Sequence, residues 1–283
     1  MAASMNTQLP LDGELEKIEI NLLLEGIYRR YGYDFRNYSY ASIRRRIWHR
    51  LRLEGLENVS SLQAKVMHHS EVFHRLLGDL VIPVTEMFRD PDMFLAFRRD
   101  IIPLLRELPF IRIWHAGCST GEEVYSMAIL LNEEGLLHKS RIYATDISES
   151  ALQRAKDGII PIDRMKKYTK NYQLAGGQQS FSDYYISDHG TVMVKPFLRQ
   201  PIVFARHNLV TDSSFNEFHV IMCRNVMIYF NSQLRDQAHK LFYESLAQEG
   251  FLTLGGKESI SFTPMAGRYE ACNDKYRIFR KIR

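Results

Sequence analysis

The chain has 283 residues, which is enough for one large domain or two smaller ones. Hydrophobic residues make up 45% and charged residues 25%, the balance of a globular protein, and no apolar run approaches the ~20 residues of a membrane-spanning helix. The formal charge of +4 is too small to indicate nucleic-acid binding by itself. The cysteines, Cys118, Cys223 and Cys272, show neither paired nor metal-finger spacing, and the first residues lack the pattern of a secretory signal. We therefore expect reduced thiols, no metal site and a cytoplasmic location.

Residues 14–106 have helical periodicity, with apolar residues three and four positions apart and with Gly32 and Gly55 where helices would stop. Pro103 and Pro109 then break this pattern. From Pro109 onward, short apolar strands alternate with helical segments, the clearest helix running from about Gln233 to Gln248. Such alternation is typical of a doubly wound, largely parallel sheet. The pattern predicts a helical N-terminal domain over residues 1–108 and an α/β domain over residues 109–283.

A polar, aromatic-rich stretch between Gly158 and Gln200 interrupts the alternation. Within it, strand-like runs at 184–187 and 191–194 flank turn residues at 188–190, which is typical of a hairpin. We therefore expect a small antiparallel β-subdomain, inserted at about residues 159–200.

The strand 111–116 runs directly into the loop GCSTGEE and a helix, where a doubly wound fold binds its nucleotide. Gly117 and Gly121 would let the backbone pass close to a ligand, but the loop is neither G-x-G-x-x-G nor a P-loop. Glu122 and Glu123 would repel a pyrophosphate and attract a cationic ligand such as S-adenosylmethionine. Asp146, 25 positions after Gly121 at a strand end, suits the two ribose hydroxyls. Taken singly, the glycines could equally serve only the turn and Asp146 only the cap of the next helix.

Two later strands end in residues that would reach the same place, because ligands of open parallel sheets bind beyond the carboxyl ends of strands. Asn225 and Tyr229 follow the strand 218–223, and Asn208 closes the strand 201–208. Asn225 could instead be a turn residue and Tyr229 a packed aromatic. The Asn/Asp-Pro-Pro-aromatic motif of methyltransferases that modify nucleic-acid amino groups is not matched here, since both prolines are missing.

The motifs GCSTGEE, ATDIS, HNL, CRNVMIYF and PVTEMFRDP together resemble those of the CheR-type protein-glutamate O-methyltransferases, which modify chemotaxis receptors. The resemblance spans nearly the whole chain. It implies an all-helical N-terminal domain, a Rossmann-like domain with an inserted β-subdomain, and S-adenosylmethionine as methyl donor. The products would be glutamate methyl esters on cytoplasmic helices of chemoreceptors, made for sensory adaptation, and S-adenosylhomocysteine.

Motif positions in this family imply the roles of particular residues. Arg89 and Tyr229 would lie nearest to the transferred methyl group and act in catalysis. The implied cofactor contacts are Thr85, Arg89, Gly117, Glu123, Asp146, Asn208, Leu209, Asn225 and Val226.

Two departures from the family pattern limit these expectations. Pro83 stands where many members have Asn, so a side-chain contact from that position is lost. The hairpin turn Ser-Asp-His-Gly, at 187–190, is shorter than the Gly-rich loop of members that dock on a receptor's C-terminal pentapeptide. The short turn suggests an enzyme that works without the pentapeptide.

A glutamate side chain, with a reference pKa near ~4.3, is already an anion at cytosolic pH, so methyl transfer needs positioning and no strong general base. The helix from about Ala41 to Leu53 has one basic face and one apolar face. The basic face could be only a solvated surface, but it would suit docking of acidic receptor helices. Its substrate-binding candidates are Arg44, Arg45, His49 and Arg52.

Three other functions stay open at this point. A methyltransferase that acts on RNA or a small molecule would also use these motifs, as would a non-catalytic adenosyl-binding signalling module. An NAD-dependent oxidoreductase is a distant third, because the loop lacks the third glycine and carries two glutamates. We expect a chemoreceptor partner, no nucleic acid, no membrane insertion and a monomer.

Overall fold

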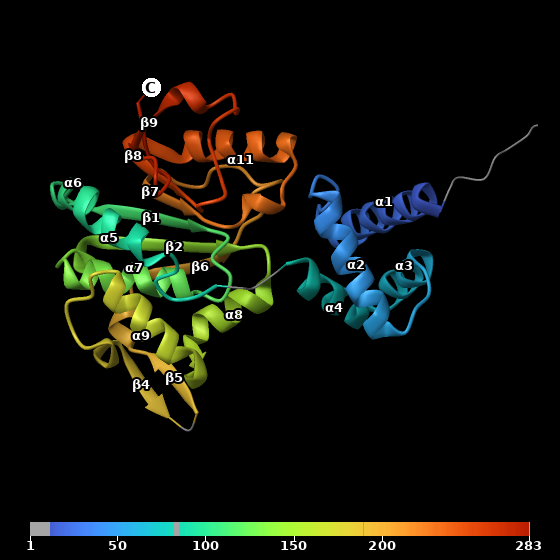
Figure 1. The fold of residues 1–283 in the computed structure, drawn as a ribbon, viewed down its shortest axis with the longest axis horizontal. Coiled ribbons are helices and arrows are strands. Elements are labelled where there is room, and N and C mark those ends of the chain that lie inside the picture. Colours follow the sequence, from blue (N-terminus) through green and yellow to red (C-terminus); the bar gives the residue numbers. More distant parts are fainter. Residues whose placement is uncertain (1–11, 82–84, 189, 283) are drawn as a thin grey trace, which may run out of the picture. The chain divides into compact units, whose positions relative to one another are not determined.

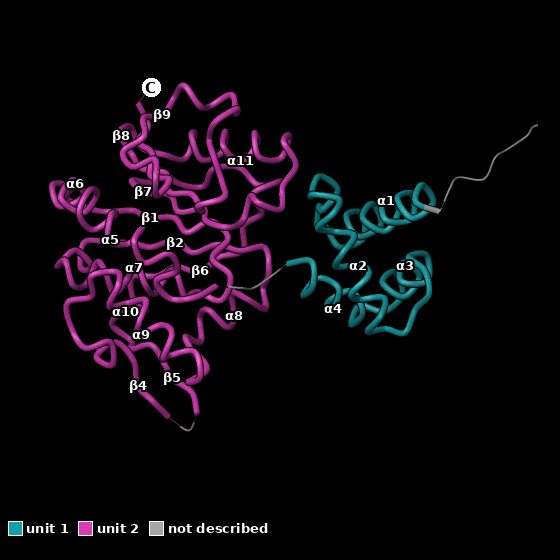
Figure 2. Tube along the Cα trace, in the orientation of Figure 1, with its two compact units in different colours: residues 1–82 teal, residues 83–283 magenta. Residues whose placement is uncertain are grey.

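The computed structural model describes residues 12–81, 85–188 and 190–282. The chain divides into two compact units, residues 1–82 and 83–283 (Figure 2). This division differs from the boundary expected near Pro109. The helices α5 (Pro91–Asp100) and α6 (Ile102–Arg106) account for the difference, because their apolar side chains belong to the core of the second unit. Helical periodicity alone could not show which core a helix joins.

Over residues 12–81, unit 1 consists of four helices that bury one apolar face each in a common core. These helices are α1 (Asp12–Tyr31), α2 (Tyr40–Glu54), α3 (Val59–His68) and α4 (Ser70–Leu80). Helices α1 and α2 stop just before Gly32 and Gly55, as predicted. Two arginines of α2 are buried: Arg46 donates to the carbonyl oxygen of Leu80 at 2.6 Å, and Arg50 donates to Asp79 at 2.6 Å. These two side chains therefore hold α2 against α4.

Unit 2 is built on a seven-stranded sheet in the order β6-β2-β1-β7-β8-β10-β9 (Figure 1). Its first five strands in this order run parallel, and β10 and β9 add antiparallel. The predicted Rossmann-like sheet is thus confirmed, although the last two strands were not predicted. The strands are β1 (Ile111–Ala116), β2 (Ser140–Asp146), β6 (Ile202–Arg206), β7 (Phe218–Cys223), β8 (Leu246–Leu254), β9 (Tyr269–Asn273) and β10 (Ile278–Lys281).

Helices cover both faces of this sheet. The longer helices are α7 (Glu122–Glu133), α8 (Glu149–Asp157) and α11 (Ser232–Ser245). Short helical turns lie at η1 (Leu137–Lys139), α10 (Pro196–Arg199), η4 (Met227–Tyr229) and η5 (Ala266–Arg268). Side chains alternate along β1, so Ile113 joins the core with α7, while Trp114 packs against Phe242 of α11, the ring centroids 5.6 Å apart.

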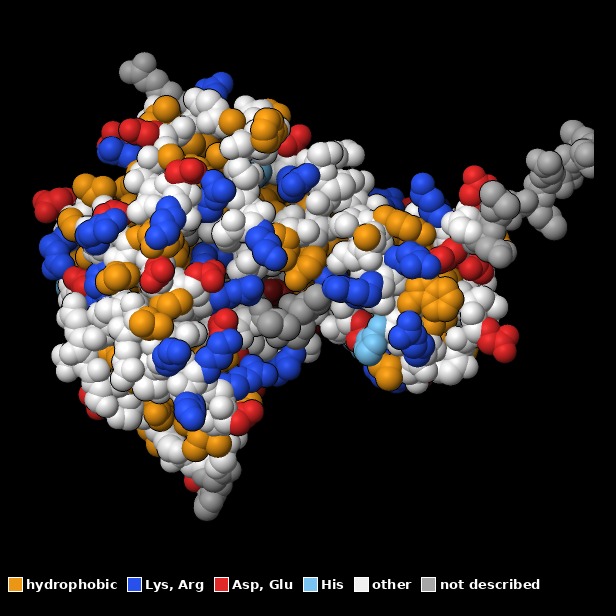
Figure 3. Space-filling model, viewed as in Figure 1, with side chains coloured by type: hydrophobic (Ala, Val, Ile, Leu, Met, Phe, Trp, Pro, Cys, Tyr) orange, Lys and Arg blue, Asp and Glu red, His pale blue; other side chains and the backbone are white. Residues whose placement is uncertain are grey.

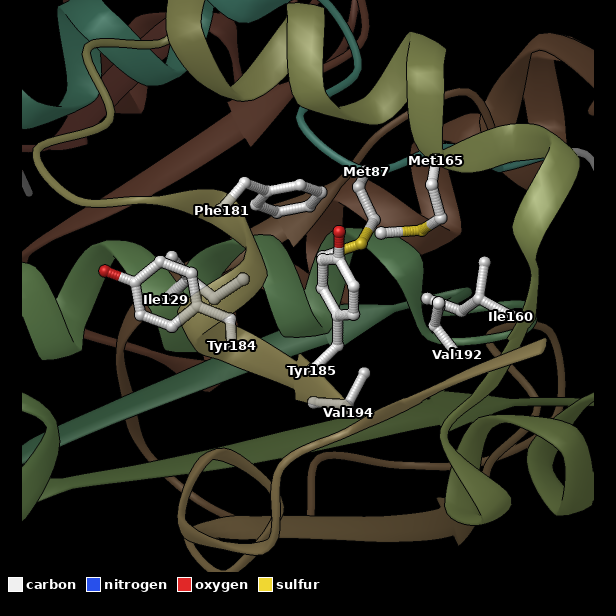
Figure 4. A pocket seen from close by; sticks show the side chains of 9 residues that line it. All are labelled: Met87, Ile129, Ile160, Met165, Phe181, Tyr184, Tyr185, Val192 and Val194. Carbon is white, nitrogen blue, oxygen red and sulfur yellow. The ribbon is translucent and has the colours of Figure 1, made fainter. Parts of the chain in front are cut away.

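A three-stranded antiparallel sheet in the order β3-β5-β4 is inserted between β2 and β6, which confirms the predicted β-subdomain. Its elements are β3 (Ile159–Pro161), η2 (Ile162–Arg164), α9 (Met165–Leu174), η3 (Phe181–Tyr184), β4 (Tyr185–Asp188) and β5 (Thr191–Val194). A small apolar pocket joins the insert to the rest of the unit (Figure 4). In it, Tyr185 and Met165 of the insert lie beside Met87, and Tyr184 of the insert lies beside Ile129 of α7. The packing anchors the insert on α7.

Two of the residues discussed above fall in segments that the structure does not describe. Pro83 and, in the hairpin turn, His189 lie outside the described residues. Over the ranges that are described, no helix is both long and apolar enough to cross a membrane. Cys118, Cys223 and Cys272 are free thiols.

Candidate functional site

The predicted site residues of unit 2 gather at one edge of the sheet. Strands β6, β2, β1 and β7 are neighbours and run parallel, so their carboxyl ends lie side by side. Gly117 follows β1, Asp146 ends β2, Asn208 comes two residues after β6, and Asn225 two residues after β7. Topology alone therefore brings together residues that are far apart in the sequence.

The loop between β1 and α7 approaches the loop after β7 closely at one glycine. Gly117 has φ +79°, and a Cβ atom built there would lie 2.5 Å from Cγ2 of Val226. The amides of Gly117 and Cys118 both donate to the carbonyl oxygen of Thr145 at 2.8 Å, which ties the loop to the end of β2. Glycine is thus required at 117 both by the left-handed backbone and by the contact with Val226.

Asp146 joins the ends of β1 and β2. It is 7% exposed, and its two carboxylate oxygens accept the amides of Ser119 at 2.8 Å and Ser148 at 2.9 Å. The cap of α8 is Ser148 rather than Asp146, because its hydroxyl accepts the amide of Ala151. Burial raises the pKa of Asp146, against the effect of these amide donors. Each oxygen keeps a lone pair for a further donor, as a ribose contact would need.

Glu123 is held between two basic side chains. One oxygen lies 3.2 Å from Nδ1 of His115, and the other accepts from Nη1 of Arg224 at 2.8 Å. Burial alone would raise the pKa of Glu123, but Arg224 and His115 outweigh it and hold the pKa below its ordinary value. The neighbouring Glu122 accepts from the Thr120 hydroxyl at 2.6 Å, and burial raises its pKa.

Arg224 also fixes the segment that carries Arg89. Its guanidinium pairs with Asp90 at 2.6 Å and donates to the carbonyl oxygen of Arg89 at 3.2 Å, while its side chain is only 1% exposed. The amide of Phe88 donates to the hydroxyl of Ser126 on α7 at 2.8 Å. Residues 85–90 thus belong to the sheet unit.

The remaining predicted residues lie in three segments: Thr85 and Arg89 before α5, Leu209 after β6, and Tyr229 after β7. Thr85, Arg89, Leu209 and Tyr229 are half-buried, and Tyr229 lies on η4. Asn208 is buried, and its side-chain oxygen accepts the amide of residue 210 at 3.0 Å, so the loop after β6 is locally braced.

Polar atoms at this edge that lack a hydrogen-bond partner among the described residues show whether the expected methyl donor fits the site. The buried atoms Nε2 of His115, Oγ of Ser119 and Oδ1 of Asn225 have no hydrogen-bond partner within the described parts of the chain. Such groups are costly unless a ligand or water satisfies them. Together with the carboxylate of Asp146 at the ends of the same strands, these atoms suit a ligand with hydroxyls and an ammonium, and the carboxylate disfavours a pyrophosphate.

Sequence reasoning missed two residues of this site. Arg224 lies inside the motif CRNVMIYF, but the sequence indicates no role for it. Its role follows from its ion pairs with Asp90 and Glu123, which are distant in sequence. Glu258 follows β8, and its buried carboxylate accepts backbone amides of the loop after β7. No sequence signal marks Glu258, because its partners are about 30 positions away.

The candidate docking residues are in unit 1. Arg44, Arg45, His49 and Arg52 are all exposed on α2. Arg44 is partly neutralised, since its Nε lies 2.6 Å from Glu16. Figure 3 shows Lys, Arg and His side chains beside apolar ones on the visible face of this unit.

Comparisons with known proteins match one family model in each unit of the chain. The family described as "CheR methyltransferase, SAM binding domain" matches residues 83–275, and "CheR methyltransferase, all-alpha domain" matches residues 18–81. The Pseudomonas putida protein named Cher3 is 54% identical over 93% of this chain and 97% of its own. The chemotaxis protein methyltransferase of Borreliella burgdorferi is 30% identical over 90% of this chain and 94% of its own. That of Salmonella typhimurium is 29% identical over 83% and 81%.

Proposed function

This chain belongs to the CheR family of S-adenosylmethionine-dependent protein-glutamate methyltransferases, and we propose that it esterifies glutamates in the cytoplasmic helices of chemoreceptors. The observation that carries the proposal is the clamp of Arg224. It joins Asp90, Glu123 and the carbonyl oxygen of Arg89, and so assembles three separate family motifs at one edge of the sheet.

The cofactor contacts that we propose follow from this edge. Asp146 receives the ribose hydroxyls, and Glu123 faces the amino-acid end of the donor. Thr85, Arg89 and Gly117 complete that side. Asn208, Leu209, Asn225 and Val226 line the adenosine. When bound, S-adenosylmethionine supplies an electrophilic methyl group on a sulfonium.

The reaction requires little acid–base catalysis by the protein. A glutamate oxygen of the receptor forms a bond to the methyl carbon, and the electron pair of the broken carbon–sulfur bond stays on sulfur. The products are a methyl ester and a neutral thioether, and no proton is transferred. A glutamate with a reference pKa near ~4.3 is ionised without a base. Holding oxygen, carbon and sulfur in line can supply up to about 7–11 kcal/mol in favourable systems.

We assign positioning of the acceptor to Tyr229 and Arg89. Tyr229 would donate one hydrogen bond to the acceptor carboxylate. Arg89 would orient it from the other side without a tight ion pair, which would blunt the nucleophile. The support is that both are half-buried, and that the backbone on which Arg89 lies is fixed by Arg224.

We further propose that Arg45, His49 and Arg52 of α2 attract acidic receptor helices. Arg45 and Arg52 have no ion-pair partner in the described part of the chain, so their charge is available for docking. Arg44 contributes less, because Glu16 already balances it. A positive face of this kind accelerates encounter with an acidic partner, and the effect weakens with salt.

The docking proposal is tested by reversing charge on α2. Arg45→Glu with Arg52→Glu should lower kcat/KM for a receptor fragment about tenfold at low salt, and the deficit should shrink as salt rises. S-adenosylhomocysteine affinity should not change. The matched control, Lys17→Glu with Arg30→Glu, makes the same change of net charge on exposed positions of α1. Equal losses in the two double variants would show that only net charge matters and would reject α2 as the docking face.

We also propose that the enzyme works without a receptor pentapeptide. The support is the short connection between β4 and β5, in which only residues 189 and 190 separate the strands. Receptor fragments with and without their C-terminal tails should then be methylated with equal kcat/KM. A requirement for the receptor's C-terminal tail would reject pentapeptide independence and leave the proposed methyl transfer standing.

The function itself is tested by transfer of labelled methyl from S-adenosylmethionine to chemoreceptor cytoplasmic fragments, with bulk RNA as the competing acceptor. Label should enter the receptor and be released by mild base, as esters are. Label in RNA would favour a methyltransferase that acts on RNA. Base-stable label in the receptor would show that the product is not a glutamate methyl ester.

A further inference from the structure

Glu258 is a buried carboxylate that the proposed chemistry does not use. It lies in the turn after β8, which its own amide closes on the carbonyl oxygen of Gly255 at 2.8 Å. The residue is 5% exposed. Burying a carboxylate is costly unless its oxygens are satisfied, so its partners show what it stabilises.

Five backbone amides converge on this carboxylate. Oε1 accepts the amides of Val226 at 2.9 Å, Met227 at 2.8 Å and Ile228 at 3.3 Å. Oε2 accepts the amides of Asn225 at 2.9 Å and Gly255 at 2.7 Å. Four of the five donors are successive residues of one loop, Asn225–Ile228, which we call the β7 loop.

The backbone of the β7 loop explains why it needs an anion. Asn225 has φ +61°, a left-handed conformation that is unfavourable for residues other than glycine, and Val226 follows with φ −106° and ψ −54°. A left-handed residue beside a right-handed one turns successive amides toward one point and forms a nest that binds anions. Here the anion is the chain's own Glu258, and its hydrogen bonds offset the strain at Asn225.

The β7 loop also presents the residues that the proposed site uses. Oδ1 of Asn225 is buried and has no hydrogen-bond partner among the described residues, and Val226 lies against Gly117. We propose that Glu258 is a positioning residue for the cofactor: its carboxylate fills the nest of the β7 loop and fixes Asn225 and Val226 in the conformation that binds S-adenosylmethionine. The inference rests on the proposed cofactor contacts of these two residues, and it is independent of the methyl acceptor.

Only a carboxylate of this length satisfies the nest. In Glu258→Gln the amide offers one acceptor, and its NH₂ group would face at least two backbone donors. Glu258→Asp keeps the charge, but the side chain is shorter by one methylene, so the carboxylate lies farther from the amides of the β7 loop. Gly255 allows a third perturbation, because a Cβ there would lie 2.7 Å from Oε2 of Glu258 and 2.8 Å from the amide nitrogen of Asn225.

The experiment measures the Kd of S-adenosylhomocysteine by calorimetry, well below the melting temperature of each full-length variant. Glu258→Gln should raise Kd by about tenfold or more, and Glu258→Asp should give a smaller rise. The control is Glu133→Gln. Glu133 is likewise a buried carboxylate, which pairs with Arg98 at 2.6 Å and accepts the amide of Gln178 at 3.0 Å, away from the β7 loop.

A purely structural role for Glu258 predicts a different result. Glu133→Gln should lower the melting temperature but leave Kd within about twofold of wild type. A folded Glu258→Gln with wild-type Kd, or equal rises in Kd for Glu258→Gln and Glu133→Gln, would overturn the proposal. Should Glu258→Gln fail to fold, Gly255→Ala is measured instead, and an unchanged Kd in that variant would overturn it. If the wild-type enzyme does not methylate receptor fragments while the variants show the predicted pattern of Kd, the proposed acceptor is rejected and the role of Glu258 stands.

Discussion

Replacing Gly117 by alanine tests the close contact at the centre of the candidate site. The new Cβ would have a left-handed backbone, φ +79°, which costs about 1–2 kcal/mol for a residue with a side chain. It would also lie 2.5 Å from Cγ2 of Val226, an overlap that costs about 1–3 kcal/mol once neighbours shift. The expected total is about 2–5 kcal/mol of unit 2 stability. The Kd of S-adenosylhomocysteine should also rise.

Gly135→Ala is the matched control. Gly135 also has a left-handed backbone, φ +69°, but a Cβ there would meet no atom within 4 Å. This variant should therefore show only the backbone cost of about 1–2 kcal/mol and unchanged ligand affinity. Adding Val226→Ala to Gly117→Ala should recover part of the lost stability, because it removes the overlapping methyl groups. The assay is denaturant unfolding of the transition that S-adenosylhomocysteine shifts. Equal losses for Gly117→Ala and Gly135→Ala would refute the contact with Val226.

Two further predictions concern single side chains of unit 2. Tyr229→Phe should lower kcat for receptor methylation about tenfold or more, with little change in S-adenosylhomocysteine affinity, since it removes only the proposed hydrogen bond to the acceptor; equal loss of both would contradict this role. His239 is fully buried, and burial lowers its pKa from 6.5 to about 4, so protonation favours the unfolded chain. Stability should therefore fall by about 3 kcal/mol as pH drops from 6.5 to 4, and His239→Leu should lose this dependence in urea unfolding measured across that range. A variant with the wild-type pH profile would contradict the assignment.

The sequence predicted the elements whose signal is local. The strand at 111–116, its loop and the following helix were found because a short apolar run and a Gly-containing turn precede a helical pattern. Where tertiary pairing decides, the prediction was wrong. The helix expected to end at Gln248 ends at Ser245, because Leu246 begins β8 and pairs with Phe218. Helical periodicity continues through Leu246, so no local pattern marks the change from helix to strand.

The residues of the candidate site were likewise predictable where a local motif marks them, and not where a distant partner decides. Positions in recognisable motifs could be selected because Asp146 ends a predicted strand and Asn225 follows one. The contacts that hold them depend on partners distant in sequence, as with Arg224 and Asp90 or Glu258 and Asn225. No local pattern encodes such pairs. The domain boundary behaves likewise, since the apolar face of α5 could pack on either core.

We propose that a receptor glutamate accepts the methyl group at the edge of the sheet where Arg224 joins Arg89 and Glu123. The most direct measurement is mass-spectrometric mapping of a chemoreceptor fragment after incubation with the enzyme and S-adenosylmethionine. Methyl groups should be found on glutamate side chains only, and mild alkaline treatment should remove them. Receptor fragments left unmodified by an enzyme that binds S-adenosylhomocysteine, or methyl groups found on other residue types, would contradict it.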